Sequence, residues 1–119
     1  NKELSDDEIS KLLMHLESSN GKNKSNADEG EVKWITGLTP VAIKELKRTG
    51  IKDSVDINNK NDVLDASVKY FKLMKKRHPE LSDAEIYVDY YWGGASNEEK
   101  RKKRINEVES FVNKNLVKL

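Results

Sequence analysis

Apolar residues recur at three- and four-residue intervals in five separate stretches of the chain, which is the period of an amphipathic α-helix. The first stretch contains Ile9, Leu12, Leu13 and Leu16. The third, over residues 63–74, has the broadest apolar face, and this predicts a central and largely buried helix. The last runs over residues 105–116. The pattern therefore predicts a mainly α domain of about five helices.

Side chains that cap helices stand in front of these stretches. The capping-box spacing, a hydroxyl followed three residues later by Glu, begins at Ser5, Ser82 and Ser96. Thr39 and Pro40 suit the N-cap and the first position of another helix, because proline has no N–H to leave unsatisfied there. Helix breakers follow the second, third and fourth helices at Gly50, at Pro79 and at Gly93 with Gly94.

Two segments between the first and second helices follow a different pattern. Residues 20–30 have no periodicity and are rich in Asn, Gly, Ser and Lys, so they predict a long loop. Residues 32–38 return to apolar and β-branched types. We expect residues 20–39 to form a small wing, loop-rich or with a β-hairpin, and a cleft between this wing and the helical core. The 119 residues, 1–119, would form a single domain.

Composition narrows the classes of protein that this chain can belong to. The 22 basic and 21 acidic residues give a net charge of +1, which argues against a protein whose main partner is nucleic acid. The basic run over 100–104 could attract an anionic polymer, although a solvated helix face explains it better. No apolar run approaches the roughly 20 residues of a membrane span, and the first residues carry no secretory signal.

Metal and cofactor chemistry has no support in the sequence. The chain has no cysteine, which excludes a disulfide and any Cys-based zinc or redox site. His15 and His78 are far apart, and neither is flanked by carboxylates at ligand spacing. We expect neither a metal nor a cofactor.

Glu17 is the first candidate for chemistry. It follows Leu13 by four residues and lies at the edge of the first apolar stripe, so it should lie between core and solvent near the end of its helix. Partial burial and the negative end of the helix dipole both favour the protonated carboxyl. Such a carboxyl can act as a general acid near neutral pH. The alternative is an ordinary exposed glutamate at a helix end.

Half of the eight aromatic residues lie in one short window before Gly93. They are Tyr87, Tyr90, Tyr91 and Trp92. On a helix Tyr87 and Tyr91 share one stripe and Tyr90 lies on another, so the rings cover more than one face. Rings with polar tips suit a carbohydrate groove. The alternative is a cluster of core and rim aromatic residues without a ligand.

Several segments follow one another in an order that is typical of one enzyme family. Residues 16–19, Leu-Glu-Ser-Ser, end the first helix, and after a loop come 33–36, Lys-Trp-Ile-Thr, and the helix that begins at Pro40. An Asp- and Asn-containing connection over 55–59 precedes the long third helix, and 90–94, Tyr-Tyr-Trp-Gly-Gly, end the fourth. This arrangement resembles the lytic transglycosylases and related phage lysozymes, which cut the glycan strands of peptidoglycan. The resemblance implies a lysozyme-like fold.

The resemblance also implies roles for particular residues. Glu17 takes the place of the catalytic acid and base, and the Ser18 hydroxyl lies beside it. Tyr91, or Tyr90 in the alternative register, takes the place of the aromatic residue whose hydroxyl reaches the catalytic carboxylate. Substrate-binding positions are implied at Ser18, Trp34, Thr36, Tyr90, Tyr91 and Trp92.

Three residues depart from the family pattern. Thr36 stands where the family has Gln, Lys33 stands where it has Gly, and Trp92 stands where many members have Asn. These departures fit either a divergent, phage-borne branch or a domain that has lost activity and keeps the fold for docking to glycan or to a partner protein.

The implied reaction needs only one carboxyl group. Glu17 would protonate the glycosidic oxygen between N-acetylmuramic acid and N-acetylglucosamine, and then take the proton of the muramyl 6-hydroxyl as a 1,6-anhydro ring closes. A hydrolytic lysozyme of the inverting type needs a second carboxylate, about 6.5–9.5 Å away, to activate water. Asp28, Glu29 and Glu31 are the candidates for it, although a solvated turn explains them better. We therefore expect a lytic transglycosylase ahead of a hydrolase.

The same resemblance implies partners and a place of action. The substrate would be the glycan strands of peptidoglycan, and proteins of a virion or a secretion machine are further partners. The chain would act in the periplasm or at the cell wall, carried there by a virion or by another route that does not use a signal of its own.

Overall fold

The computed structural model describes residues 4–18, 36–92, 94 and 96–116. Within these ranges the chain forms five α-helices and two π-helical turns, with no strand. The α-helices are α1 (Asp6–Ser18), α2 (Pro40–Arg48), α3 (Lys60–Arg77), α4 (Asp83–Ile86) and α5 (Glu98–Phe111). The π-helical turns are η2 (Tyr87–Tyr91) and η3 (Val112–Leu116). The expected helical class and five helices are confirmed, whereas most of the expected wing, with its loop or β-hairpin, lies outside the described residues.

The predicted caps form at three of the four helix starts. Ser5 and Glu8 make both bonds of a capping box, at 3.2 and 2.9 Å. Ser82 and Glu85 do the same at 3.1 and 2.9 Å. The Thr39 hydroxyl oxygen accepts the backbone N–H of Ala42, the third residue of α2, at 3.2 Å. These bonds satisfy donors that the first helical turn leaves free, so the local sequence sets where each helix begins.

The cap of α5 differs from the prediction by one residue. Asn97, rather than Ser96, is the N-cap, and its side chain accepts the backbone N–H of Lys100 at 2.8 Å. Asparagine caps a helix at least as well as serine, so the capping-box spacing from Ser96 to Glu99 does not decide the start.

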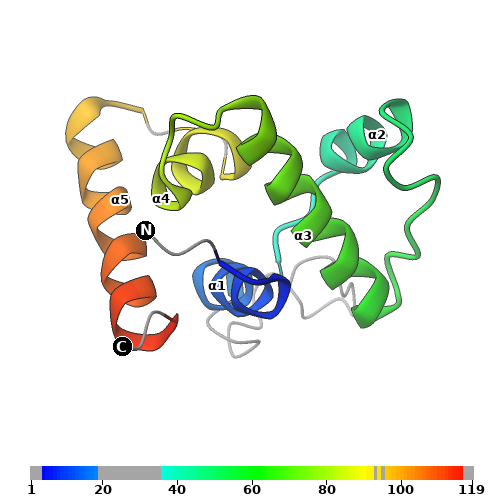
Figure 1. The fold of residues 1–119 in the computed structure, drawn as a ribbon, viewed down its shortest axis with the longest axis horizontal. Coiled ribbons are helices and arrows are strands. Elements are labelled where there is room, and N and C mark those ends of the chain that lie inside the picture. Colours follow the sequence, from blue (N-terminus) through cyan, green and yellow to red (C-terminus); the bar gives the residue numbers. More distant parts are fainter. Residues whose placement is uncertain (1–3, 19–35, 93, 95, 117–119) are drawn as a thin grey trace.

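Helix α3 is the centre of the fold. It crosses the molecule between α2 on one side and α4 with α5 on the other, and α1 lies across its flank (Figure 1). Seven of its residues are buried, which confirms the predicted central helix. No helix in the described ranges is long and apolar enough to cross a bilayer.

The buried apolar residues form two clusters that meet on α3. The smaller one joins α2 to the first half of α3 and contains Leu38, Ala42, Leu46, Val63 and Ala66. The larger one joins α1, the second half of α3, α4 with η2, and α5. Tyr70 packs against both. The end of α1, which carries Glu17, is therefore held by the larger cluster.

Candidate active site around Glu17

Glu17 lies in the last turn of α1 and is half-buried, as the edge of the apolar stripe predicted. Burial raises the pKa of its carboxyl above the ordinary value of 4.5. A hydrogen bond from Tyr87 and the positive charge of Arg104 oppose this increase in part. The carboxyl is therefore partly shielded from water and held by specific partners.

Tyr87 donates its hydroxyl proton to Oε2 of Glu17. The residue follows α4 directly and begins the wide turn η2, which the bond from Trp92 N to Tyr87 O closes at 2.7 Å. Its side chain is fully buried, and burial together with the neighbouring carboxylate raises the pKa of its phenol far above 10. Tyr87 therefore stays protonated and remains a hydrogen-bond donor to Glu17.

Gly37 lies against the other oxygen of the same carboxyl. Its backbone has a φ of +66°, a conformation that residues other than glycine rarely adopt. A Cβ atom at this position would overlap Oε1 of Glu17. The turn at Gly37 therefore leaves the space in which Oε1 lies.

Arg104 reaches the site from α5. Its Nη2 atom donates to the Tyr87 hydroxyl oxygen at 3.2 Å and to the Leu16 carbonyl oxygen at 3.4 Å. Its guanidinium carbon lies 5.5 Å from the centre of the Tyr87 ring and 5.1 Å from that of Trp92. The site thus brings together a carboxyl from α1, a phenol from η2 and a guanidinium from α5.

Tyr91 does not make the bond that the resemblance assigned to it. Its hydroxyl donates to the Thr36 carbonyl oxygen at 2.6 Å, and Tyr87 is the residue whose hydroxyl reaches Glu17. The two rings stack with their centres 5.8 Å apart, one turn from each other along η2. The Tyr87 ring faces the end of α1. The hydroxyl that contacts Glu17 therefore belongs to the residue one helical turn before Tyr91.

Thr36 is placed inside the protein. Its side chain is fully buried, and its hydroxyl lies 2.6 Å from that of Ser67 on α3. The structure therefore gives the Thr36 hydroxyl a partner in the core, while its carbonyl receives Tyr91.

Tyr90 and Trp92 are the exposed members of the aromatic window, with 39% and 42% of their surface accessible. Tyr90 stacks on His78 with ring centres 4.0 Å apart, and Trp92 faces Arg104. Tyr87 is buried and Tyr91 half-buried, so the prediction that the rings cover more than one face is confirmed.

Several predicted positions cannot be placed. The side chain of Ser18 and the whole of Trp34 lie outside the described residues. The same holds for Lys33 and for the candidate second carboxylates Asp28, Glu29 and Glu31. The expected cleft would be bounded by this part of the chain.

Three residues were not predicted as members of the site, although the sequence carried a signal for each. Tyr87 shares a helical stripe with Tyr91. Arg104 precedes the buried Val108 by four residues, so it lies on the inward side of α5 despite its place in a basic run. Gly37 precedes the Thr39 cap, where a tight turn is expected.

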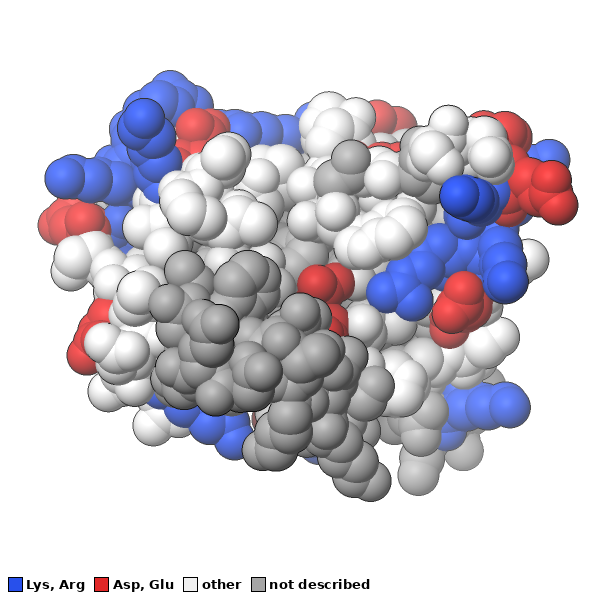
Figure 2. Space-filling view, turned by 180° about the vertical axis from the view of Figure 1, so that it is seen from behind, with Lys and Arg blue, Asp and Glu red and all other residues white. Residues whose placement is uncertain are grey.

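The basic run of α5 divides into two groups. Lys100, Lys102 and Lys103 are exposed, as a solvated face predicts. Arg101 instead pairs with both oxygens of Asp89 at 2.9 Å, and Arg104 turns toward Tyr87. On the face seen in Figure 2, Lys, Arg, Asp and Glu side chains gather toward the two sides, and an acidic side chain also lies near the middle.

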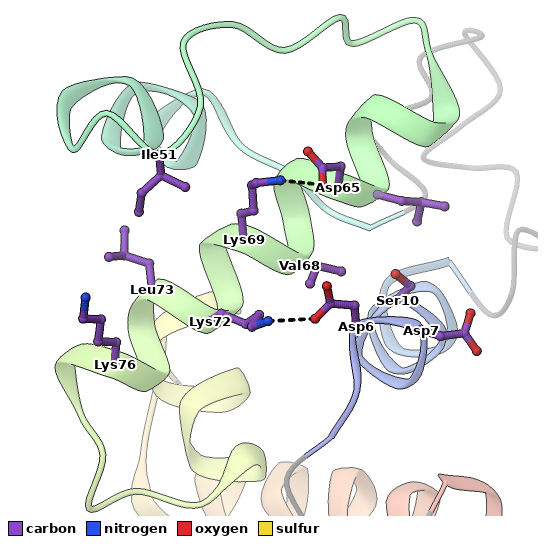
Figure 3. A pocket seen from close by; sticks show the side chains of 11 residues that line it. Asp6, Asp7, Ser10, Ile51, Asp65, Val68, Lys69, Lys72, Leu73 and Lys76 are labelled. Atoms are coloured by element: carbon purple, nitrogen blue, oxygen red, sulfur yellow. Dashed lines mark hydrogen bonds and ion pairs between the residues drawn. The ribbon is translucent and has the colours of Figure 1, made fainter.

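A hollow of about 580 Å³ lies between the start of α1 and α3, apart from Glu17 (Figure 3). Apolar side chains such as Val68 and Leu73 line it. Two of the lysines that line it pair within the protein, Lys69 with Asp65 at 2.7 Å and Lys72 with Asp6 at 2.8 Å. Its lining includes neither Glu17 nor the two partners of Glu17, Tyr87 and Arg104.

Comparison of this chain with protein-family models, with curated proteins and with solved structures found no match.

Proposed function

We propose that this chain is a lysozyme-like domain that cleaves the β-1,4 bond between N-acetylmuramic acid and N-acetylglucosamine in peptidoglycan at the cell wall. The observation that carries the proposal is the half-buried carboxyl of Glu17, whose pKa is raised by burial and whose Oε2 accepts the Tyr87 hydroxyl. A raised pKa lets a carboxyl keep its proton to higher pH than an exposed glutamate does, and this favours a role as general acid. The resemblance of residues 16–19 and of the later segments to lytic transglycosylases supplies the substrate class.

In the proposed reaction Glu17 acts twice. The neutral carboxyl gives its proton to the glycosidic oxygen, which leaves as the hydroxyl of N-acetylglucosamine. The resulting carboxylate takes the proton from the muramyl 6-hydroxyl as that oxygen bonds to the anomeric carbon and closes the 1,6-anhydro ring. Tyr87 and Arg104 favour the carboxylate formed in the first step, because both lower the pKa of Glu17.

Glu17→Gln tests the proposal. The variant keeps the size and a hydrogen-bond acceptor for Tyr87, but its amide cannot supply the proton. Release of muropeptides from purified sacculi should fall to background, whereas Glu109→Gln, the same change at an exposed position on α5, should retain the wild-type rate. Release by Glu17→Gln at the wild-type rate would refute the assignment.

Mass spectrometry of the products distinguishes the two chemistries of cleavage. Anhydro-muramyl ends identify the transglycosylase reaction, which needs Glu17 alone. Reducing ends identify hydrolysis, in which a second carboxylate activates water.

A non-catalytic glycan-binding module is the second candidate. The burial of the Thr36 hydroxyl favours it, because the position that has Gln in the family makes its hydrogen bond to Ser67. The exposed rings of Tyr90 and Trp92 could bind sugar without cleaving it. Retention of wild-type protein on sacculi without release of muropeptides would support this candidate.

A further inference from the structure

We propose that Arg104 is a positioning residue that fixes the direction of the hydrogen bonds from Arg104 to Tyr87 to Glu17, and so keeps the acid proton on Oε1 of Glu17. The inference rests on the proposed function of Glu17. It adds which oxygen delivers the proton and which residue selects that oxygen.

The chemistry of the three groups sets the direction of the chain. A guanidinium has only donors, so the Tyr87 oxygen must accept the bond from Arg104 Nη2 at 3.2 Å. The phenol has a single proton, and its acceptor is Oε2 of Glu17. With Arg104 in place, the Tyr87 hydroxyl therefore points its proton toward the carboxyl.

This direction selects between the two oxygens of the carboxyl. Because Oε2 accepts a proton from Tyr87, the neutral carboxyl carries its own proton on Oε1. Oε1 is the oxygen beside Gly37, where the absence of a Cβ leaves room for it. The acid proton is thus held on the side of the turn at Gly37, away from the phenol.

Arg104 is held firmly enough to perform this role. Its guanidinium lies near the rings of Tyr87 and Trp92, and Nη1 donates to Glu107 Oε2 at 3.4 Å. Its Nε is buried without a partner in the described part of the chain. The bonds of Nη1 and Nη2, together with the two rings, therefore hold the guanidinium beside the Tyr87 hydroxyl.

The groups that face Glu17 come from every described element around it. Tyr87 and Tyr91 lie on η2 and Arg104 lies on α5, while the turn at Gly37 contributes no titratable side chain. Tyr91 is neutral because burial raises the pKa of its phenol. Arg104 is therefore the positive charge among these groups, and its removal should raise the pKa of Glu17.

The experiment measures the pKa of Glu17 directly, by NMR titration of protein labelled with ¹³C at the glutamate carboxyls. Arg104→Gln should raise this pKa by about one pH unit, the lower end of the effect of a nearby opposite charge. Arg101→Gln is the matched control, because Arg101 also ties α5 to η2, through Asp89, without facing Glu17. It should leave the pKa of Glu17 unchanged.

Two further measurements separate the electrostatic role from the positioning role. The basic limb of the pH–rate profile for muropeptide release should move upward with the pKa in Arg104→Gln. At a pH where Glu17 is fully protonated in both proteins, the variant should still be slower, because the Tyr87 proton is no longer directed to Oε2. Arg104→Lys, which keeps the charge, should restore the pKa but not this low-pH rate.

An unchanged Glu17 pKa in folded Arg104→Gln, or an equal shift in Arg101→Gln, would overturn the proposal. If Arg104→Gln does not fold, Tyr87→Phe and Arg104→Lys decide: the first should raise the pKa, the second should keep it, and the opposite results overturn the inference. If wild-type protein releases no muropeptides, the proposed function fails, while the titration still tests whether Arg104 acts on Glu17.

Discussion

The carboxyl of Glu17 is confined on both of its oxygens. Tyr87 contacts Oε2 through a hydrogen bond, and the backbone of Gly37 lies beside Oε1. The second constraint depends on a missing atom, since any Cβ at position 37 would overlap the carboxyl. Gly37 therefore has two reasons to be glycine, its φ of +66° and the space that Glu17 occupies.

Gly37→Ala should lower the free energy of unfolding by about 2 kcal/mol or more, because strain at a positive φ adds to the overlap with Glu17. Gly50→Ala is the matched control: its φ is +75° but a Cβ there meets nothing within 4 Å, so about 1 kcal/mol is expected. Urea unfolding at pH 7 measures both. In a Glu17→Ala background, Gly37→Ala and Gly50→Ala should lower the free energy of unfolding by the same amount. A difference that persists there would contradict the overlap with Glu17.

The sequence predicted that Glu17 lies between core and solvent, because this placement depends on the local periodicity of the first helix. Four residues after Leu13 on one helix, it had to lie at the edge of the apolar stripe. Tyr87 and Arg104 could not be assigned in the same way, because their roles depend on how η2 and α5 pack against the end of α1. Helical spacing shows which side of an element faces inward, but not which neighbour it meets.

At the scale of elements, two hydroxyls join Thr36, which lies just before α2, to α3. The Ser67 hydroxyl donates to the Val63 carbonyl oxygen at 2.7 Å, so its single proton is used within the helix. The Thr36 hydroxyl, 2.6 Å away, is then the donor to Ser67. The Tyr91 hydroxyl donates to the Thr36 carbonyl oxygen. Residue 36 is thereby fixed to two helical elements, and the turn at Gly37 is fixed with it.

Ser67→Ala should destabilise the protein by about 1–3 kcal/mol, because it removes the buried hydroxyl that pairs with the Thr36 hydroxyl at 2.6 Å. Thr36→Val combined with Ser67→Ala removes both polar groups and should recover much of that loss. Ser110→Ala, at an exposed position on α5, is the control and should change the unfolding free energy by less than about 0.5 kcal/mol. A double variant that is less stable than Ser67→Ala would rule out this account.

The element boundaries show what local sequence decides. Ser5, Thr39 and Ser82 cap helices as predicted, because a cap involves residues within one turn of each other. The change from α4 to the wider turn η2 at Tyr87 was not predicted, since the apolar pattern there fits either kind of turn. Packing of the neighbouring rings, rather than a local signal, accompanies that change.

At the scale of the whole molecule, the buried carboxyl makes stability depend on pH. A raised pKa means that the folded protein holds the Glu17 proton more tightly than the unfolded chain does. Its contribution to stability is complete below the unfolded value near 4.5, and is lost as the pH rises through the higher folded value.

Glu17→Gln should therefore become more stable relative to wild type between pH 4 and pH 8. Each unit by which the folded pKa is raised corresponds to about 1.4 kcal/mol of this relative change. Urea unfolding of both proteins at several pH values measures it, with Glu109→Gln as the exposed control. A constant difference between Glu17→Gln and wild type across this range would show that burial does not raise the pKa of Glu17.

Two of the contacts that hold the site end on backbone carbonyls, those of Leu16 and Thr36. Any amino acid supplies a carbonyl, so the identity of the side chain at either position is not what receives Arg104 or Tyr91. These two hydrogen bonds therefore depend on the donors Arg104 and Tyr91, and not on which side chain stands at position 16 or 36. In a divergent relative, we expect the hydrogen bonds from Arg104 and Tyr91 to persist even where residues 16 and 36 differ.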